Sequence, residues 1–139
     1  MTMTATHLLD TSVFSQPLKR KPVKLALDRW AAMGDARLAV SVISEAEVRY
    51  GIEWKGAVTQ REEFETDLIR RLPILAVDSA VARAYALIRA ELRRQGHPVG
   101  DMDLLIAATA KTHNLIVATL NMRDFDKIPG LTVEDWSQT

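Results

Sequence analysis

Residues 103–118 read DLLIAATAKTHNLIVA, and this run predicts a helix that passes directly into a strand. From Asp103 to His113 the residues are apolar on almost every side of a helix, as expected for a helix enclosed by the core. The four apolar residues at 115–118 are typical of a strand that is buried on both faces of a parallel sheet. This part of the chain therefore favours an α/β fold.

The rest of the sequence continues the alternation of strands and helices. We expect further strands at 7–9, 37–42 and 74–77, and helices at 23–33, from 44 onward, at 58–71 and from about 79 to 96. Such alternation predicts a central parallel sheet with right-handed crossovers and helices on both faces, an α/β/α sandwich. Ligands of these sheets bind beyond the carboxyl ends of the strands. Asp10 and Asn121 follow two predicted strands, so we expect them to share one cleft.

Length and composition indicate a single domain over residues 1–139. The hydrophobic share is 47% and no apolar run is long enough to span a bilayer, so a membrane protein is excluded. Residues 1–6 lack the basic and apolar parts of a signal peptide, and we therefore expect a cytoplasmic protein. The absence of cysteine excludes disulfides and thiolate chemistry.

The formal net charge is zero, so the molecule as a whole has no general attraction for nucleic acid. Positive charge is concentrated locally, because Lys19, Arg20, Lys21 and Lys24 lie within fifteen residues of Asp10. A solvated cationic surface is the ordinary explanation of such a cluster. Phosphate binding beside a metal site is the alternative, and both interpretations stay open at this point.

Three acidic residues lie at the edges of buried elements. Asp10 closes the apolar run 7–9, Glu47 enters a helix after a strand, and Asp103 directly precedes the apolar residues 104–108. Carboxylates at such edges are costly unless a cation gathers them, since two unit charges 4 Å apart repel by about 4 kcal/mol at an effective dielectric of 20. Oxygen ligands suit a hard cation such as Mg²⁺ or Mn²⁺. Without metal, at least one carboxyl should keep its proton above its normal pKa.

Asp10 and Glu47 each have a structural alternative. An Asp at the end of a strand is often a turn former or an N-cap, although Thr11 or Ser12 could cap here instead. Glu47 fits a capping box in which Ser44 is the N-cap. Glu45 and Glu47 point about 200° apart on a helix, so only one of them can face a given cleft. We assign Glu47 to the cleft and Glu45 to the surface.

The third acidic residue has a competitor two positions earlier. Asp101 follows Gly100 and is well placed to cap the helix, whereas Asp103 enters that helix and would be an unpaired interior charge without a cation. We therefore expect Asp103 in the site and Asp101 at the helix start.

The chemistry that remains is the hydrolysis of a phosphodiester by metal-activated water. A Gly-rich triphosphate-binding loop and the elbow motif of a nucleophilic serine are both missing from the sequence. Zinc is disfavoured because His7, His97 and His113 have no cysteine partners and form no paired motif.

Four segments together resemble the PIN-domain ribonucleases, and most closely the VapC-type toxins of bacterial toxin–antitoxin pairs. They are LLDTSV at 8–13, AEVRYG at 46–51, DLLIAATA at 103–110, and VATLN at 117–121 followed by DF at 124–125. The segments occur in the family's order and cover essentially the whole chain. The FitB-like branch is similar too, especially over residues 10–18.

The resemblance implies a PIN-like fold and a Mg²⁺- or Mn²⁺-dependent endoribonuclease that acts as a toxin. Asp10, Glu47 and Asp103 would be its acidic ligands, and Ser12 would support Asp10. Relatives usually form homodimers and are silenced by a small DNA-binding antitoxin of the VapB type, with which they form a heterocomplex. The choice of RNA as substrate depends on the resemblance alone, so a DNA nuclease and a catalytically silent PIN-like binding module stay open.

One position departs from the family pattern. The fourth acidic position, often Asp, is Asn121 here, so the site would hold one metal ion firmly and a second only weakly. Asp124, three residues further on, could replace the missing carboxylate.

Overall fold

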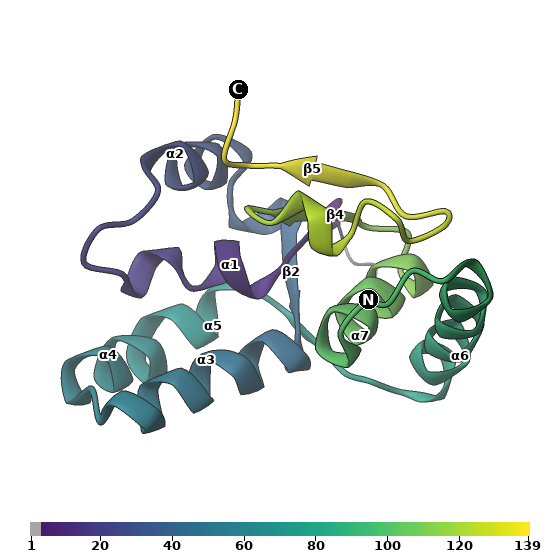
Figure 1. Ribbon diagram of the computed structural model, residues 1–139. Helices are drawn as coiled ribbons and strands as arrows, with labels where there is room; N and C mark the ends of the chain where they lie inside the picture. Colours follow the sequence, from purple (N-terminus) through teal and green to yellow (C-terminus); the bar gives the residue numbers. More distant parts are fainter. Residues whose placement is uncertain (1–3) are drawn as a thin grey trace.

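A computed structural model describes residues 4–139, which contain a five-stranded sheet with helices around it (Figure 1). The strands are β1 (His7–Leu9), β2 (Leu38–Ser41), β3 (Ile74–Leu75), β4 (Ile116–Thr119) and β5 (Val133–Asp135). The α-helices are α1 (Thr11–Phe14), α2 (Lys24–Met33), α3 (Val42–Lys55), α4 (Val58–Glu63), α5 (Ile69–Arg71), α6 (Ser79–Gln95) and α7 (Asp101–Thr112). Shorter helical turns are η1 (Gln16–Leu18), η2 (Asp35–Arg37) and η4 (Met122–Asp124), and η3 (Phe64–Leu68) is a π-helical segment between α4 and α5.

The strand order is β3-β2-β1-β4-β5, and every neighbouring pair is parallel. Leu8 of β1 is paired with Ala39 of β2 on one side and with Val117 of β4 on the other. Strands β2 and β3 are added on one side of β1, and the chain then returns to add β4 and β5 on the other side. The order therefore reverses between β1 and β4, which is where sheets of this kind leave a crevice for a ligand.

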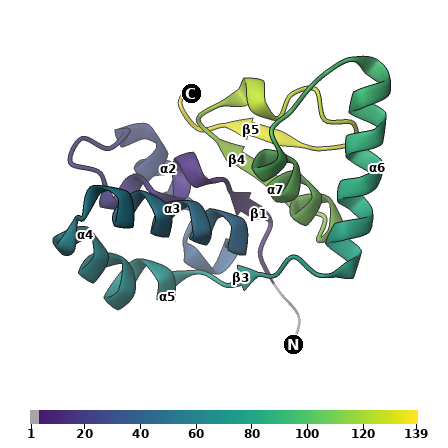
Figure 2. The same cartoon turned by 60° about the horizontal axis from the view of Figure 1, so that its bottom comes forward.

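Each central strand supplies side chains to two separate cores, because successive residues of a strand point to opposite faces of the sheet. Leu8 and Val117 belong to one core, while their neighbours Leu9 and Ala118 belong to the other, and all four are fully buried. Figures 1 and 2 show α6 and α7 grouped away from α1 to α5. The predicted α/β/α sandwich with a parallel sheet is confirmed.

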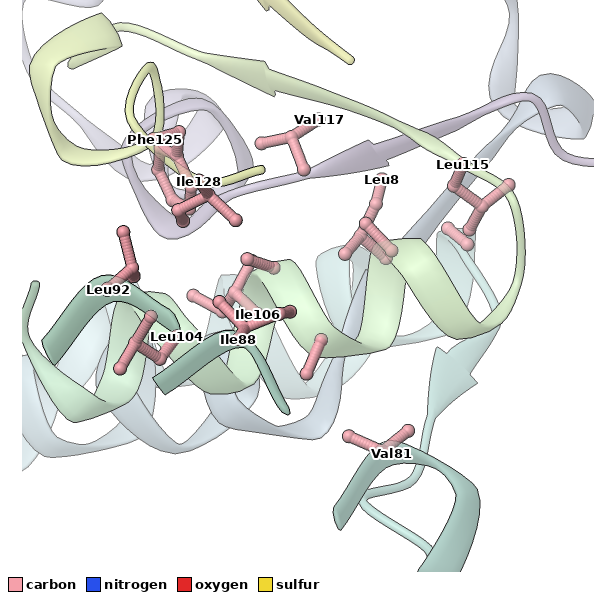
Figure 3. Packing of buried hydrophobic residues seen from close by; sticks show 14 residues of the cluster. Leu8, Val81, Ile88, Leu92, Leu104, Ile106, Leu115, Val117, Phe125 and Ile128 are labelled. Carbon is pink, nitrogen blue, oxygen red and sulfur yellow. The ribbon is translucent and has the colours of Figure 1, made fainter. Parts of the chain in front are cut away.

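The core between the sheet and α6 and α7 uses an apolar stripe on α6. Val81, Ile88 and Leu92 are buried at helical spacing and pack with Leu104 and Ile106 of α7 (Figure 3). Because α7 is covered by the sheet on one side and by α6 on another, it is apolar nearly all round. This enclosed helix carries Asp103 in its first turn.

The start of α3 differs from the expectation. Ser41 is the N-cap, and its Oγ accepts a hydrogen bond from the backbone N–H of Ile43 at 3.0 Å. The helix therefore begins at Val42, two residues before Ser44, and the capping box with Ser44 as N-cap is wrong. Glu47 is the sixth residue of α3, so its carboxylate is free of a capping role.

Other boundaries also differ from the sequence pattern. The strand expected at 74–77 is limited to Ile74–Leu75, and the helix expected at 58–71 contains the π-helical turn η3. Strand β5 was not predicted. It is joined to β4 by parallel pairing, and the backbone N–H of Trp136 donates to the carbonyl of Thr119 at 2.8 Å. Within residues 4–139, no helix combines the length and the apolar character needed to cross a membrane.

Candidate active site

Asp10 lies directly after β1, at the point where the strand order reverses, and only 4% of the residue is exposed. Its Oδ1 accepts hydrogen bonds from the Ser12 hydroxyl at 2.5 Å and from the Val13 N–H at 3.2 Å. Its Oδ2 accepts from the Thr119 hydroxyl at 2.7 Å. Asp10 is thus the N-cap of α1, and the expectation that Thr11 or Ser12 would cap is wrong. Burial raises the pKa of Asp10, and these hydrogen bonds partly oppose the increase.

Two hydroxyl groups connect Asp10 to the segment that follows β4. The Ser12 Oγ donates to Asp10 and accepts from the Leu120 N–H at 3.0 Å. The Thr119 Oγ1 donates to Asp10 and accepts from the Asn121 N–H at 2.9 Å. The sequence pointed to Ser12 but gave no role to Thr119, whose only signal was a polar residue at the end of a buried apolar strand.

Replacing Thr119 with valine should show how much this hydrogen bond contributes. The shape is kept, but Asp10 loses a donor inside the protein, which should cost about 1–3 kcal/mol of unfolding free energy near neutral pH. Any activity that depends on the orientation of Asp10 should fall by about 10- to 100-fold. Urea unfolding and rate measurements test both effects.

The matched control for this substitution is Thr109→Val. Thr109 is equally buried, but its hydroxyl donates only to the Leu105 carbonyl within α7. Equal stability and equal activity of the two valine variants would show that the bond from Thr119 to Asp10 has no special importance.

Glu47 reaches the same region from α3 through a contact with α1. The Thr11 hydroxyl donates to Glu47 Oε1 at 2.5 Å and also lies 2.9 Å from the Ser44 Oγ. Because Thr11 directly follows Asp10, this contact holds Glu47 beside the first carboxylate. Glu45 instead pairs with Arg49, four residues further along the helix, at 2.8 Å.

Asp103 lies half-buried in the first turn of α7, and its pKa is raised to about 6. Burial is the largest cause, followed by the negative charges of Asp124, Glu47 and Asp10. The N-terminus of a helix favours an anion by only about 0.3–1 kcal/mol, which is too little to outweigh these effects. The four carboxylates therefore share one electrostatic environment, and Asp103 is a carboxyl that holds its proton unusually well.

The raised pKa of Asp103 gives a testable pH dependence. Folded protein binds this proton more tightly than unfolded chain does, so the contribution of Asp103 to stability should decrease as pH rises from about 4 to about 6. Because the group is partly exposed, solvent screening should limit the decrease to about 1 kcal/mol. Unfolding of the metal-free protein and of Asp103→Asn over this pH range isolates the effect. If the unfolding free energies of the parent and of Asp103→Asn differed by the same amount at every pH, the prediction would be wrong.

Asp101, the expected competitor, lies elsewhere. Gly100 is the N-cap of α7, so the expectation of an Asp101 cap is wrong. The exposed Asp101 carboxylate accepts a hydrogen bond from the Tyr85 hydroxyl at 2.9 Å and lies 3.3 Å from the Arg89 guanidinium. The Asp101 carboxylate thus contacts residues of α6.

The two residues proposed for the fourth acidic position both follow β4. Asn121 and Asp124 are exposed and line one hollow of about 470 Å³. Only Asp124 carries a charge, and among the three neighbouring carboxylates it raises the pKa of Asp103 most. Asp124 of η4 therefore supplies the negative charge that Asn121 cannot supply to the acidic group.

The basic cluster is divided by the fold. Lys19, Arg20 and Lys21 line a groove of about 870 Å³ that also includes Glu47. Lys24 begins α2 and pairs with Asp28 at 2.8 Å instead.

The donor chemistry fits a hard divalent cation, because the acidic group offers carboxylate oxygens whose mutual repulsion a cation would relieve. Asp10, Asp103, Glu47 and Asp124 are the residues that could hold it. Over residues 4–139, no three Asp, Glu or His side chains are gathered tightly enough to form a metal site as they stand. Binding would therefore draw the carboxylates closer together.

Comparison with known proteins identifies the family to which this fold belongs. The PIN domain model matches residues 7–131. The chain therefore belongs to the PIN-domain family.

Within this family, curated relatives are VapC proteins. The chain is 36% identical over 129 residues to the "tRNA(fMet)-specific endonuclease VapC" of Salmonella typhimurium, covering 93% of this chain and 96% of the relative. It is 34% identical over 130 residues to the protein of that name from Shigella flexneri, covering 94% and 97% of the two chains.

Solved structures of similar proteins have the same fold. FitAcB from Neisseria gonorrhoeae matches with a TM-score of 0.89 at 30% identity, covering 96% of this chain and all of the other. DNA-bound VapBC from Salmonella typhimurium matches with a TM-score of 0.83 at 36% identity, covering 95% and 98%.

Proposed function

We propose that this chain is an endoribonuclease that acts as the toxin of a VapBC-type toxin–antitoxin pair. The observation that carries the proposal is a group of four carboxylates in a PIN domain, in which Asp124, Glu47 and Asp10 act on Asp103 and Asp10 follows β1 where the strand order reverses. RNA is favoured over DNA because similar proteins along the whole chain are named tRNA-specific endonucleases. The reaction is the hydrolysis of an RNA phosphodiester.

Asp10, Glu47 and Asp103 are proposed as the ligands of Mg²⁺ or Mn²⁺, with Asp124 as the fourth carboxylate. Such an ion, when bound, would activate water and stabilise charge on the phosphodiester. Ser12 and Thr119 fix the orientation of Asp10, and Thr11 fixes that of Glu47. Asp103, with its raised pKa, must release a proton before a cation can bind, so binding should strengthen as pH rises through about 6.

The proposed partners are a DNA-binding antitoxin of the VapB type and a second copy of the chain. Complexes with DNA are described for the similar VapBC and FitAB proteins. Apolar surface for protein contacts is available on α3 and α4, where Tyr50, Trp54 and Val58 are strongly exposed. We also propose that residues 1–139 form one domain and that the toxin acts on RNA in the cytoplasm.

RNA cleavage by protein freed of any antitoxin tests the proposed function. A broad RNA pool should be cut when Mg²⁺ or Mn²⁺ is present and left intact when a chelator is added, and activity should return with excess metal. DNA of matching sequences should stay intact. Cleavage that continues in chelator would contradict the metal-dependent mechanism, and cutting of DNA alone would identify a DNA nuclease. No cleavage of RNA or DNA by folded, metal-bound protein would support a binding module.

A further inference from the structure

A groove runs from the acidic group along α3. Thr11 and Glu47, which are hydrogen-bonded to each other, line one part of it. Gly51 and Lys55 follow Glu47 at intervals of four residues on the same helix, so they extend this wall of the groove. The opposite wall is the segment after α1 that contains Lys19, Arg20 and Lys21. The groove therefore connects Glu47, one of the proposed catalytic carboxylates, to a basic surface.

The charge of this groove is strongly one-sided. Its lining contains four cations and one anion, which are Lys19, Arg20, Lys21, Lys55 and Glu47. None of these four cations forms an ion pair with a carboxylate in the part of the chain described by the structure, although Lys24 nearby does. Since the molecule has no net charge, the unpaired cations are a local feature. Like charges held close together repel, so an anionic ligand would stabilise them.

The basic segment is held in position by hydrogen bonds from buried and partly buried glutamines. Gln16 is 4% exposed, and its amide donates to the Ser12 carbonyl at 2.8 Å and accepts from the Val23 N–H at 2.7 Å. Gln60 of α4 donates to the Leu18 carbonyl at 2.8 Å and also lines the groove. The backbone under the cations is therefore preorganised, which reduces the entropy lost when a ligand binds.

We propose that this groove holds a single strand of RNA next to the phosphodiester that is cut, with Lys19, Arg20, Lys21 and Lys55 on its backbone phosphates. The inference rests on the proposed function and adds the path of the substrate. Positively charged grooves that follow the backbone are how proteins bind single strands without sequence preference. These contacts would determine the position of the strand, and groups nearer the carboxylates would select the sequence.

Binding of labelled single-stranded RNA of mixed sequence, about 12 nucleotides long, tests the groove by fluorescence anisotropy. Chelator is present throughout, and KCl is varied. The triple variant Lys19→Ala, Arg20→Ala, Lys21→Ala should bind at least about 10-fold more weakly at low salt. The slope of log affinity against log salt should become shallower by about 0.7 for each phosphate that is no longer neutralised, or about 2 in total. Lys24→Ala, whose lysine lies outside the groove, should retain the parent affinity and slope.

A second variant fills the groove without changing its charge. Gly51 has no atom within 4 Å of the position that a Cβ would take, so Gly51→Gln can fold, and it replaces a poor helix former inside α3. Its melting temperature should be no lower than that of the parent, yet its RNA affinity should fall several-fold. Parent-like RNA binding by both the triple variant and Gly51→Gln would overturn the proposal. So would a triple variant that loses affinity for the antitoxin alone, because the groove would then be an antitoxin site.

Cleavage kinetics test the RNA path in the groove separately from the proposed function. In the presence of metal, the triple variant should show a raised KM with kcat nearly unchanged, since the cations contribute binding that is uniform along the reaction. A reduced kcat with an unchanged KM would count against a binding role. If the parent binds RNA through the groove but never cuts it, the proposed function fails while the groove remains. If the parent cuts RNA and the variants bind RNA with the parent affinity, the proposed RNA path is wrong and the proposed function stands.

Discussion

Asp103→Asn is expected to cut RNA at least about 100-fold more slowly than the parent protein at saturating metal. The substitution keeps the size of the side chain but removes the charge at the centre of the four carboxylates. Asp10→Asn should have a comparable effect, and because Asn also caps helices well, α1 should still form. Single-turnover cleavage at several metal concentrations measures the loss in each variant.

Asp101→Asn is the matched control, since it makes the same chemical change in the same turn of α7. Asp101 is exposed and contacts Tyr85 and Arg89 of α6, so cleavage should stay within a few-fold of the parent rate. The reverse result, in which Asp101→Asn is inactive and Asp103→Asn is active, would transfer the ligand role to Asp101. Circular dichroism and melting temperatures of all three variants show whether a loss reflects unfolding.

Metal is expected to stabilise the parent protein by about 2.7 kcal/mol when its concentration is 100 times the dissociation constant. The effect should be larger at pH 8 than at pH 5, because Asp103 has a pKa of about 6 and must be ionised to bind a cation. Urea unfolding with Mn²⁺ and with chelator at both pH values provides the measurement.

Adding Mn²⁺ should reverse the order of stability of the parent and Asp103→Asn. In chelator at pH 8 the variant should be at least as stable as the parent, because one of the repelling charges is gone. With Mn²⁺ the parent should become the more stable protein. Calorimetric titration should find one tight site in the parent. Two tight and equivalent sites would show that Asn121 does not weaken a second site, and equal stabilisation of both proteins would remove Asp103 from the site.

Periodicity was sufficient to predict the layers of the fold. Consecutive apolar residues in β1 and β4 require cover on both faces of the sheet, and the separate cores around Leu8 and Leu9 provide it. Helical spacing likewise distinguished Glu45 from Glu47, because the direction of a side chain on a helix depends on its position along the helix. Helix starts were less accurate, since Ser41 and Ser44 are both good capping residues and the end of β2 decides between them.

By itself, the sequence determined the alternation of strands and helices and the placement of Asp10, Glu47 and Asp103 at the edges of buried elements. These features follow from composition and from spacing along the chain. Only the tertiary structure decided that Thr119 bonds to Asp10, 109 residues away, and that Asp124 lies close enough to Asp103 to raise its pKa. Such contacts depend on strand order and on the return of the chain to β4. Spacing along the chain carries no information about them, because the free energy that selects them comes from packing the whole sheet.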